Sequence, residues 1–588
     1  MKPVSCFGRI TLWALSLFCL INPTSIFAQE AGEQENLRQN LRLRKEIEDA
    51  RRNLVPLDRQ PPPSVLEEGD SDRPGAGISP VPSDLRIQGF VITAPPEFES
   101  SALLKTLRDE YAGMPADFST RRQIRDRLLR YCSDLGFIGD VSLGDLTESG
   151  LIPVDIGFAR LGSVIIAVNT SPVRSDWIAS VMESSNHLGS ILRLRKIDSA
   201  ILKINDLGGV YAELQYRKSE ENGAVDVVLS VQERDRFQFN IDLNNETLPY
   251  MGPYQVSGDL VYESLLGRGD YLVVDGGYSG NVNWYGSRSV GGDISIPLSP
   301  DGLGLAASYS WSDYRLLGSQ WPSQSNGSSD VLSLSLVQPL WRRPLNSLEV
   351  TLGGNYGVFN QFQADADPVR VAVPSGHLTL RGMHQDSYLG GEGLNTALLA
   401  LSAGSTISDA ESIYNLLPYS ATVTYSKGAW GRVYGLYDRF QSFGDSPFSL
   451  ELFAQGQWGS RDLYASEQFS LGWPNAVRAY PPAEASSDSG VSLQFTSRYQ
   501  INTLFSLRAF VDAGTAWPPA ESELGAAISQ PITLWGPGFG FDFGPRGNYL
   551  FTFDIAFPMS DNRYRATGLD VDGANPSSRF WLSFKKWL

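Results

Sequence analysis

The chain is poor in cysteine and histidine, which limits the chemistry that it can perform. Only three cysteines occur in 588 residues, and we expect Cys6 and Cys19 to leave with an N-terminal signal segment. Cys132 would then be the only thiol of the mature chain, which excludes an intramolecular disulfide. The three histidines are scattered: His187, His377 and His384. They lack the spacing of metal ligands, and neither a phosphate-binding glycine loop nor a Ser-His-Asp grouping is evident. We therefore expect no metal, no cofactor and no enzymatic activity.

Positive charge is also scarce. Lys and Arg together number 48 against 65 Asp and Glu, which gives a formal net charge of −17. Residues 1–28 hold two cations, Lys2 and Arg9, and no acidic residue, so their removal leaves −17 − 2 = −19. A phosphate backbone repels a chain of this charge, so bulk electrostatics argue against nucleic acid as a partner.

Long hydrophobic runs are missing as well. The apolar run at residues 10–21 is too short to span a bilayer as a helix. It follows two basic residues and precedes a small residue, Ala28, which together predict a secretory signal peptide over residues 1–28. Lipidation at Cys19 is the alternative, disfavoured because Phe18 stands where a small residue is expected. Beyond residue 28 no run is long enough for a transmembrane helix.

Glycine and aromatic residues, in contrast, are abundant: Gly numbers 57, and Phe, Trp and Tyr make up 11% of the chain. From residue 235 onward, large apolar side chains alternate with polar or small ones. The alternation is clear in residues 237–243, 348–352, 539–543 and 551–557. A period of two is typical of strands that are buried on one face only.

Either a soluble β-sandwich or a membrane barrel would show this alternation. The apolar positions are unusually large and aromatic, and the opposite positions are polar enough for a water-filled lumen. The chain also ends in an aromatic-rich alternating segment, residues 580–588. These features favour an all-β transmembrane barrel over residues 235–588. Those 354 positions, at roughly 22 residues per strand with its connection, predict about 16 antiparallel strands.

The region before residue 235 contains a repeated unit. Residues 35–55 predict a charged amphipathic helix, and the proline-rich stretch that follows predicts a linker ending near residue 84. Residues 85–158 then show the order strand, helix, helix, strand, strand (βααββ), and residues 159–234 repeat it. Two tandem copies of one unit of about 75 residues indicate a domain pair more firmly than one copy would.

A long connection rich in Pro, Gly and Ser, residues 471–490, lies between two predicted strands. Taken alone, it would be an ordinary surface loop with solvated charges. It contains Val477-Arg478-Ala479-Tyr480, Pro481, Glu484-Ala485, Asp488 and Gly490. This pattern resembles the conserved loop of the two-partner secretion transporters (TpsB), the haemolysin-activator and filamentous-haemagglutinin exporter family. Ala483 and Ser487 stand where the family usually has glycine.

A second motif, Phe510-Val511-Asp512-Ala513-Gly514, resembles the family's Phe-x-Asp-x-Gly. Spacing by two places Phe510, Asp512 and Gly514 on one strand face, toward the lumen, and the two residues between them toward lipid. Gly514 would allow another backbone to approach closely. In the family, the loop folds into the barrel and its Arg pairs with this Asp. The resemblance therefore implies a charge-assisted pair between Arg478 and Asp512.

The resemblance covers nearly the whole mature chain and implies its domain organisation. Residues 29–84 would form a plug helix and linker, residues 85–158 and 159–234 two periplasmic POTRA-like domains, and residues 235–588 the barrel with the folded-in loop. The fold class is thus α+β POTRA repeats followed by an all-β transmembrane barrel. The implied location is the bacterial outer membrane, in contact with its lipid, after insertion by the barrel assembly machinery.

The implied function is export of a secreted partner exoprotein, of haemolysin, haemagglutinin or adhesin type, that first binds the POTRA domains. Two alternatives stay open. An assembly factor of the related BamA superfamily shares the barrel and the loop arginine but usually has more POTRA units. A passive diffusion porin needs no POTRA domains, so residues 85–234 argue against it. Two POTRA units and the Glu484-Ala485 continuation favour export.

Overall fold

The structure is a computed structural model, and the part of the chain that it describes leaves out most of the N-terminal region. It describes residues 65–66, 86–98, 101–280, 286–315, 326–344, 346–363, 366–408, 427–474, 476–517, 531–545, 547–560 and 569–588. The expected signal peptide and the expected plug helix lie outside these ranges. One compact unit contains residues 235–588 with 206–208, and the other contains residues 59–205 and 209–234. In these ranges, no helix is both long and apolar enough to cross a membrane.

The first repeat forms a small sheet with two helices. Its elements are β2 (Gly89–Thr93), α2 (Ser101–Tyr111), α3 (Phe118–Asp134), β3 (Gly139–Leu143) and β4 (Leu151–Phe158). The sheet order is β2-β4-β3. Helix α3 begins where the Asp117 carboxylate accepts the Thr120 backbone N–H at 2.8 Å, an N-cap. Its buried stripe, Ile124, Leu128 and Cys132, recurs at the four-residue spacing that places one helix face on a core.

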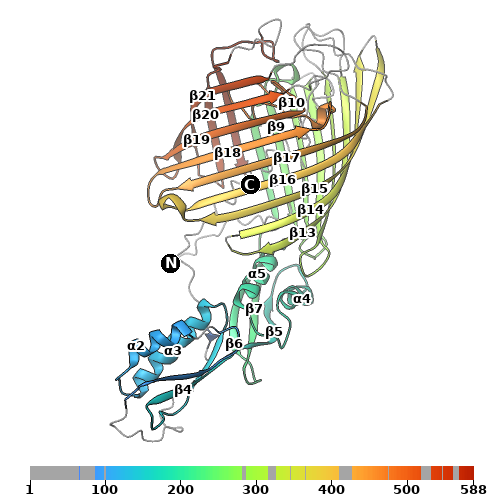
Figure 1. Cartoon of the computed structure of the whole chain (residues 1–588). Helices are drawn as coiled ribbons and strands as arrows, with labels where there is room; N and C mark the ends of the chain where they lie inside the picture. Colours follow the sequence, from blue (N-terminus) through green and yellow to red (C-terminus); the bar gives the residue numbers. More distant parts are fainter. Residues whose placement is uncertain are drawn as a thin grey trace. The chain divides into compact units, whose positions relative to one another are not determined.

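The second repeat has the same element order. Its elements are β5 (Arg160–Asn169), α4 (Ser175–Ser185), α5 (Leu194–Asn205), β6 (Val210–Lys218) and β7 (Ala224–Glu233). The βααββ order expected for both copies is therefore confirmed (Figure 1). The sheet order is β1-β6-β7-β5, where β1 (Val65–Leu66) belongs to the expected linker and runs parallel to β6. Part of the linker thus adds a strand, because the edge of β6 offers unpaired backbone groups.

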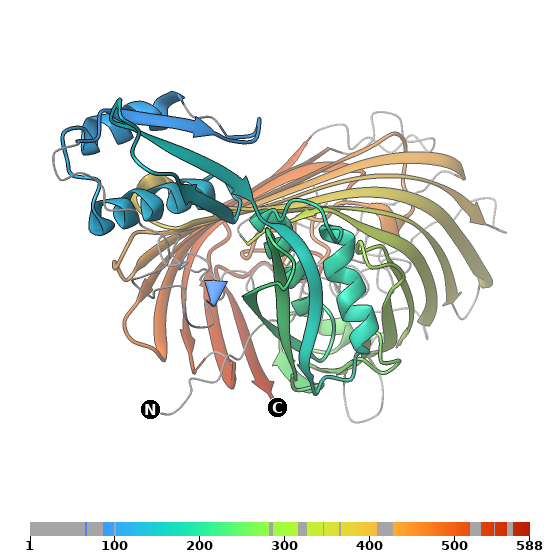
Figure 2. The ribbon, with the colours of Figure 1, turned by 90° about the horizontal axis from the view of Figure 1, so that it is seen from below.

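The remaining strands close into one antiparallel barrel (Figures 1 and 2). They are β8 (Phe237–Asn244), β9 (Gln255–Glu263), β10 (Tyr271–Gly280), β11 (Gly286–Pro297), β12 (Gly304–Arg315), β13 (Asn326–Arg342), β14 (Asn346–Gln363), β15 (Ala366–Asp386), β16 (Gly393–Ser408), β17 (Gly428–Ser442), β18 (Phe448–Gly459), β19 (Ser489–Gln500), β20 (Phe505–Trp517), β21 (Ile532–Phe543), β22 (Tyr549–Ala556) and β23 (Arg579–Trp587). Each strand pairs with its sequence neighbours, and β23 pairs with β8. The expected count of about 16 strands is confirmed, and closure leaves no free sheet edge in the barrel.

The two faces of the barrel wall differ in polarity. On β13, Leu332 and Leu334 point outward and are exposed, whereas Ser333 and Ser335 point inward and are buried. On β15, Arg381 is likewise on the buried inner side. An apolar outer band with a polar inner face is the arrangement of a barrel that contacts lipid outside and water inside, and a soluble sandwich would have the reverse.

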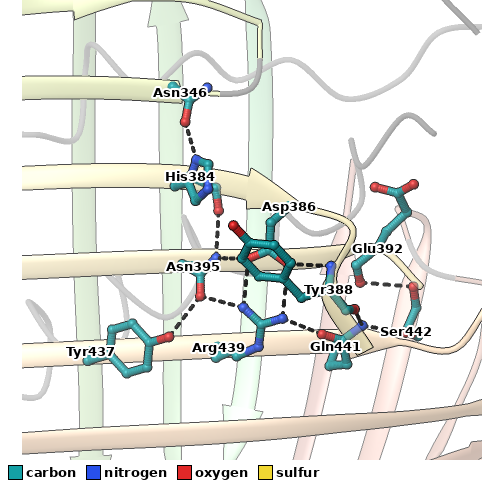
Figure 3. Close-up of polar contacts among 10 residues, drawn as sticks. All are labelled: Asn346, His384, Asp386, Tyr388, Glu392, Asn395, Tyr437, Arg439, Gln441 and Ser442. Atoms are coloured by element: carbon teal, nitrogen blue, oxygen red, sulfur yellow. Dashed lines mark hydrogen bonds and ion pairs between the residues drawn. The ribbon is translucent and has the colours of Figure 1, made fainter. Parts of the chain in front are cut away.

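The apolar band ends in a polar network on the outer face of β15, β16 and β17, at the end of the barrel where β8 begins. Arg439 donates two hydrogen bonds to Asp386, at 2.8 and 3.0 Å. Asn395 donates to the same carboxylate at 2.7 Å and accepts from the Tyr437 hydroxyl at 2.7 Å. Figure 3 shows the Arg439 guanidinium between these partners. Such a paired charge fits the headgroup level of a bilayer and not its hydrocarbon core.

Candidate functional site

Residues 471–490 do not form a surface loop. They include the second half of the connection between β18 and β19 and fold inward, so that Leu471, Val477 and Tyr480 are almost fully buried. These side chains share one apolar cluster with inward residues of the wall, among them Phe453 of β18 and Phe510 of β20. The loop is therefore packed inside the barrel, and the sequence expectation of a folded-in loop describes its position.

Arg478 and Asp512 form a bidentate ion pair inside the barrel. The Arg478 Nε donates to Asp512 Oδ2 at 2.8 Å, and its Nη2 donates to Oδ1 at 2.7 Å. The Arg478 backbone N–H donates to the same Oδ2 at 3.0 Å, and Nη2 also donates to Thr496 Oγ1 at 2.9 Å. The guanidinium carbon lies 3.5 Å from the centre of the Phe510 ring, which adds a cation–π contact.

Strand periodicity explains why Asp512 can be reached from the lumen. On β20, Phe510, Asp512 and Ala516 face inward and are buried, whereas Val511 faces outward and is 47% exposed. Asp512 is fully buried. Because a buried charge without a partner is costly, the pair specifies one position of the loop more strongly than it adds net stability.

Two glycines make room for the loop against the wall. A Cβ on Gly514 would lie 2.5 Å from the Leu471 side chain. A Cβ on Gly536 of β21 would lie 2.5 Å from the Ala479 side chain and 2.4 Å from the Phe557 carbonyl oxygen of the wall. These distances are far below normal contact, so a larger residue would displace the loop at Gly514, and the loop together with the adjoining wall at Gly536. The sequence motif anticipated Gly514. Gly536 was missed, although its alternation with large outward residues on β21 is a signal of the same kind.

The other residues of the loop motif make specific contacts. The Glu484 carboxylate accepts the Val571 backbone N–H at 2.7 Å. The Tyr480 hydroxyl exchanges two hydrogen bonds of 3.0 Å with the backbone of Ser560. Asp488 accepts the Leu463 backbone N–H at 2.8 Å. The Pro481 carbonyl accepts the Glu484 N–H, and Gly490 begins the part of β19 that pairs with β18.

One departure from the family pattern leaves the backbone conformation of the loop unchanged. Ala483, at a position where the family usually has glycine, has φ of 62°. This left-handed conformation suits glycine and costs an alanine roughly 1–2 kcal/mol. Ala485 adopts a similar φ of 49°. The loop therefore keeps the glycine-type turn despite the substitution.

A second buried ion pair anchors the beginning of the inward segment. Arg432 of β17 lies 3.0 Å from the Glu467 carboxylate, and both side chains are almost fully buried. Sequence reasoning missed this pair. Its only signal was Arg432 on the same strand face as Tyr434 and Leu436, which marks a charge directed into the barrel. In the described ranges, no group of His, Cys, Asp and Glu residues could hold a metal ion.

A closed barrel with an apolar outer band, two preceding βααββ domains and a loop fixed inside by buried ion pairs defines an outer-membrane transport barrel of the POTRA-bearing class. A family model described as haemolysin secretion/activation protein ShlB/FhaC/HecB matches residues 223–543, more than half of the chain. The chain belongs to this family. It is a two-partner secretion transporter of the bacterial outer membrane, and such transporters work with a secreted partner exoprotein.

Individual relatives have low sequence identity but align with most of the chain. The heme/hemopexin transporter protein HuxB of Haemophilus influenzae (strain 86-028NP) is 22% identical over 448 residues, 75% of each chain. The outer membrane transporter CdiB of Dickeya dadantii (strain 3937) is 23% identical over 372 residues, 61% of this chain and 63% of CdiB. Among solved structures, CdiB from Escherichia coli has a similar fold, with a TM-score of 0.67 at 18% identity, covering 96% of this chain and all of that one.

Proposed function

We propose that the chain exports one large exoprotein of haemolysin, haemagglutinin or adhesin type through the barrel lumen, and that it catalyses no reaction. The observation that carries this proposal is the folded-in loop, which occupies the lumen and is held there by Arg478 and Asp512. A lumen filled by a displaceable loop, and not by side chains of the wall alone, becomes a conducting path when the loop leaves.

The POTRA-like domains would capture the unfolded partner through a sheet edge. In the described part of the first repeat, β2 is an edge strand, and its Val91 is 53% exposed. An extended peptide can pair with such an edge and place alternate side chains against the sheet. The chain contains its own example of strand addition, because Val65–Leu66 pair with β6 of the second repeat.

Export would then require the loop to leave its position. Displacement breaks the bidentate pair and the Thr496 contact, but water entering the lumen would solvate both charges as they separate. Residues 35–55, which lie outside the described ranges, would act as a plug that leaves at the same stage. Folding of the partner outside the cell would give the movement its direction without a nucleotide.

Insertion of the transporter itself would depend on the cell's barrel assembly machinery. The apolar outer band and the aromatic terminal strand β23, with Phe580 and Phe584 outward, support this part of the proposal. The same features are common to assembly factors of the BamA superfamily, so they do not separate the two functions.

The decisive experiment co-expresses the chain with a candidate large exoprotein from a neighbouring gene and measures that protein in the medium. We expect secretion with the intact chain and none when residues 85–234 are deleted, with the barrel still present in the outer membrane. Secretion that survives the deletion would contradict capture by the POTRA-like domains. Loss of other outer-membrane barrels, with no effect on the exoprotein, would instead identify an assembly factor.

A further inference from the structure

The outer face of the barrel wall is hollowed across strands β13 to β16. The hollow has a volume of about 470 Å³, within the range of roughly 300–1,000 Å³ that is typical of small-molecule sites. Its outward lining is apolar or small and includes Leu332, Leu334, Tyr356, Pro374, Gly376 and Ala403. These residues alternate with buried inward ones such as Ser333 and His377, so the hollow opens toward lipid and not toward the lumen. We call this feature the outer hollow.

The shape of the outer hollow comes from small residues in register between large ones. Across the four strands, one row of partners reads Leu334, Gly354, Gly376 and Ala403. Apart from its chain neighbours, the described atom nearest to a Cβ on Gly376 would be the Gly353 carbonyl oxygen, at 3.8 Å. The wall itself therefore has room for a side chain at position 376. Glycine weakens a strand interior, and it often lies where a ligand approaches the backbone closely.

The height of the outer hollow places it in the outer leaflet of the membrane. Asp386 ends β15 at the periplasmic end of the barrel, where its network with Arg439 lies at headgroup level (Figure 3). Gly376 stands 386 − 376 = 10 residues further along this strand. Ten residues at about 3.3 Å each, tilted by about 40°, rise about 25 Å through a hydrocarbon core that is about 30 Å thick. The outer hollow therefore lies beyond the bilayer midplane, on the side where the bacterial outer membrane consists of lipid A.

Cations lie beyond the outer hollow, toward the extracellular end of the wall. Arg370 is exposed on the outward face of β15, and it stands 376 − 370 = 6 residues past Gly376. Lys427 is exposed just before β17, the neighbour of β16 in the barrel. On β13, the outward Asp330 already accepts the Tyr309 hydroxyl at 2.6 Å. Positive charge above an apolar hollow is complementary to a lipid that carries phosphate groups above acyl chains.

We propose that the outer hollow binds one acyl chain of lipid A, the phosphorylated and multiply acylated glycolipid of the outer leaflet, while Arg370 and Lys427 bind its phosphate groups. Inside a bilayer the gain comes from close packing, because the competing partner of the acyl chain is another lipid tail. A straight chain over Gly376 contacts the wall along the floor and the sides of the hollow. The Arg370 guanidinium can hold a phosphate through two parallel hydrogen bonds. This site is separate from export of the exoprotein and gives the transporter a fixed lipid.

The test fills the outer hollow from the lipid side. Gly376→Leu places a side chain in it without entering the lumen. Gly435→Leu is the matched control: Gly435 also faces outward, on β17, and the described atom nearest to its Cβ would be the Leu398 carbonyl oxygen, at 4.0 Å. Both variants should give the folded, SDS-resistant band of the parent on unboiled gels. If Gly376→Leu does not fold, Ala403→Leu replaces it, because Ala403 is exposed on the same floor.

The measurement is lipid retained by the full chain after purification from outer membranes in mild detergent. Native mass spectrometry counts the bound molecules, and analysis of their fatty acids and phosphate separates lipid A from phospholipid. We expect the parent and Gly435→Leu to retain one lipid A per chain, and Gly376→Leu to retain several-fold less. Arg370→Gln combined with Lys427→Gln should also retain less than the parent, because the phosphate contacts are lost.

Three outcomes would overturn the proposal. Equal retention of lipid A by Gly376→Leu and Gly435→Leu would show general contact with lipid and no site. Phospholipid in place of lipid A on the parent would place the hollow in the other leaflet. A dimer that Gly376→Leu abolishes would assign the hollow to a second copy of the chain. Each result is read from bound mass alone, so it does not depend on whether the chain secretes an exoprotein.

Discussion

Replacing one partner of the Arg478–Asp512 pair should be far more harmful than replacing both. Arg478→Met leaves the fully buried Asp512 carboxylate without its counter-ion, and Asp512→Asn leaves a buried guanidinium. Loss of one partner of a buried pair typically costs about 3–5 kcal/mol. The double variant leaves no unpaired charge, so we expect its loss to fall short of the sum of the single losses by about 2 kcal/mol or more.

The assay is unfolding of the barrel by guanidinium in detergent micelles, followed by tryptophan fluorescence, for the parent and three variants. In a single variant, the unpaired charge can also reach water if the loop leaves the lumen, so the measured loss of unfolding free energy cannot exceed the free energy that holds the loop in place. Channel conductance shows whether the loop has left, because a displaced loop gives long open states in both single variants. Arg478→Lys should lose less than Arg478→Met, since an ammonium keeps the counter-charge for Asp512 but cannot make the bidentate contact. Single losses that add to within about 0.5 kcal/mol in the double variant, with closed channels throughout, would refute the reasoning.

Three further predictions follow from the local geometry. Gly536→Ala should displace the loop and cost about 1–3 kcal/mol, with long channel openings, whereas Gly435→Ala, with no atom closer than 4.0 Å to the added Cβ, should leave conductance unchanged. Ala483→Gly should raise stability slightly, because relief of about 1–2 kcal/mol of strain exceeds the entropic cost of about 0.4–1 kcal/mol; a lower guanidinium midpoint would contradict this. Burial raises the pKa of the Cys132 thiol to about 11, so iodoacetamide at pH 8 should label this thiol only after the chain unfolds. The contribution of the protonated thiol to stability should fall as the pH rises from 9 toward 11. Rapid labelling of the native chain would contradict the burial.

The element order could be predicted from the sequence because helices and strands each have a characteristic period of apolar residues. Ile124, Leu128 and Cys132 recur at helical spacing, and residues 539–543 alternate as a half-buried strand does. Strand ends were harder to place. Strand β15 extends to Asp386 because its last residues pair with polar partners outside the apolar band, where hydrophobic alternation no longer marks a strand.

The site was predictable only where a motif recorded it. The sequence placed Asp512 on the lumen face, and the structure has Arg478 beside it; the role of this pair in gating remains a prediction. The partner of Arg432 could not be predicted, because the register of the barrel decides which inward side chains meet across the lumen. Alternation by two specifies the face of a residue but not its neighbours on distant strands.

The glycines of the barrel wall have a consequence for repeated cycles of secretion. Gly514 and Gly536 leave a recess shaped to the loop's own Leu471 and Ala479. A passing chain presents a changing series of side chains, so it has no lasting complement to that recess. We therefore expect the folded-in loop to return to its position by itself once the cargo has cleared, because this return lowers the free energy. A transporter in a compartment without ATP needs such a spontaneous return to keep the outer membrane closed between substrates.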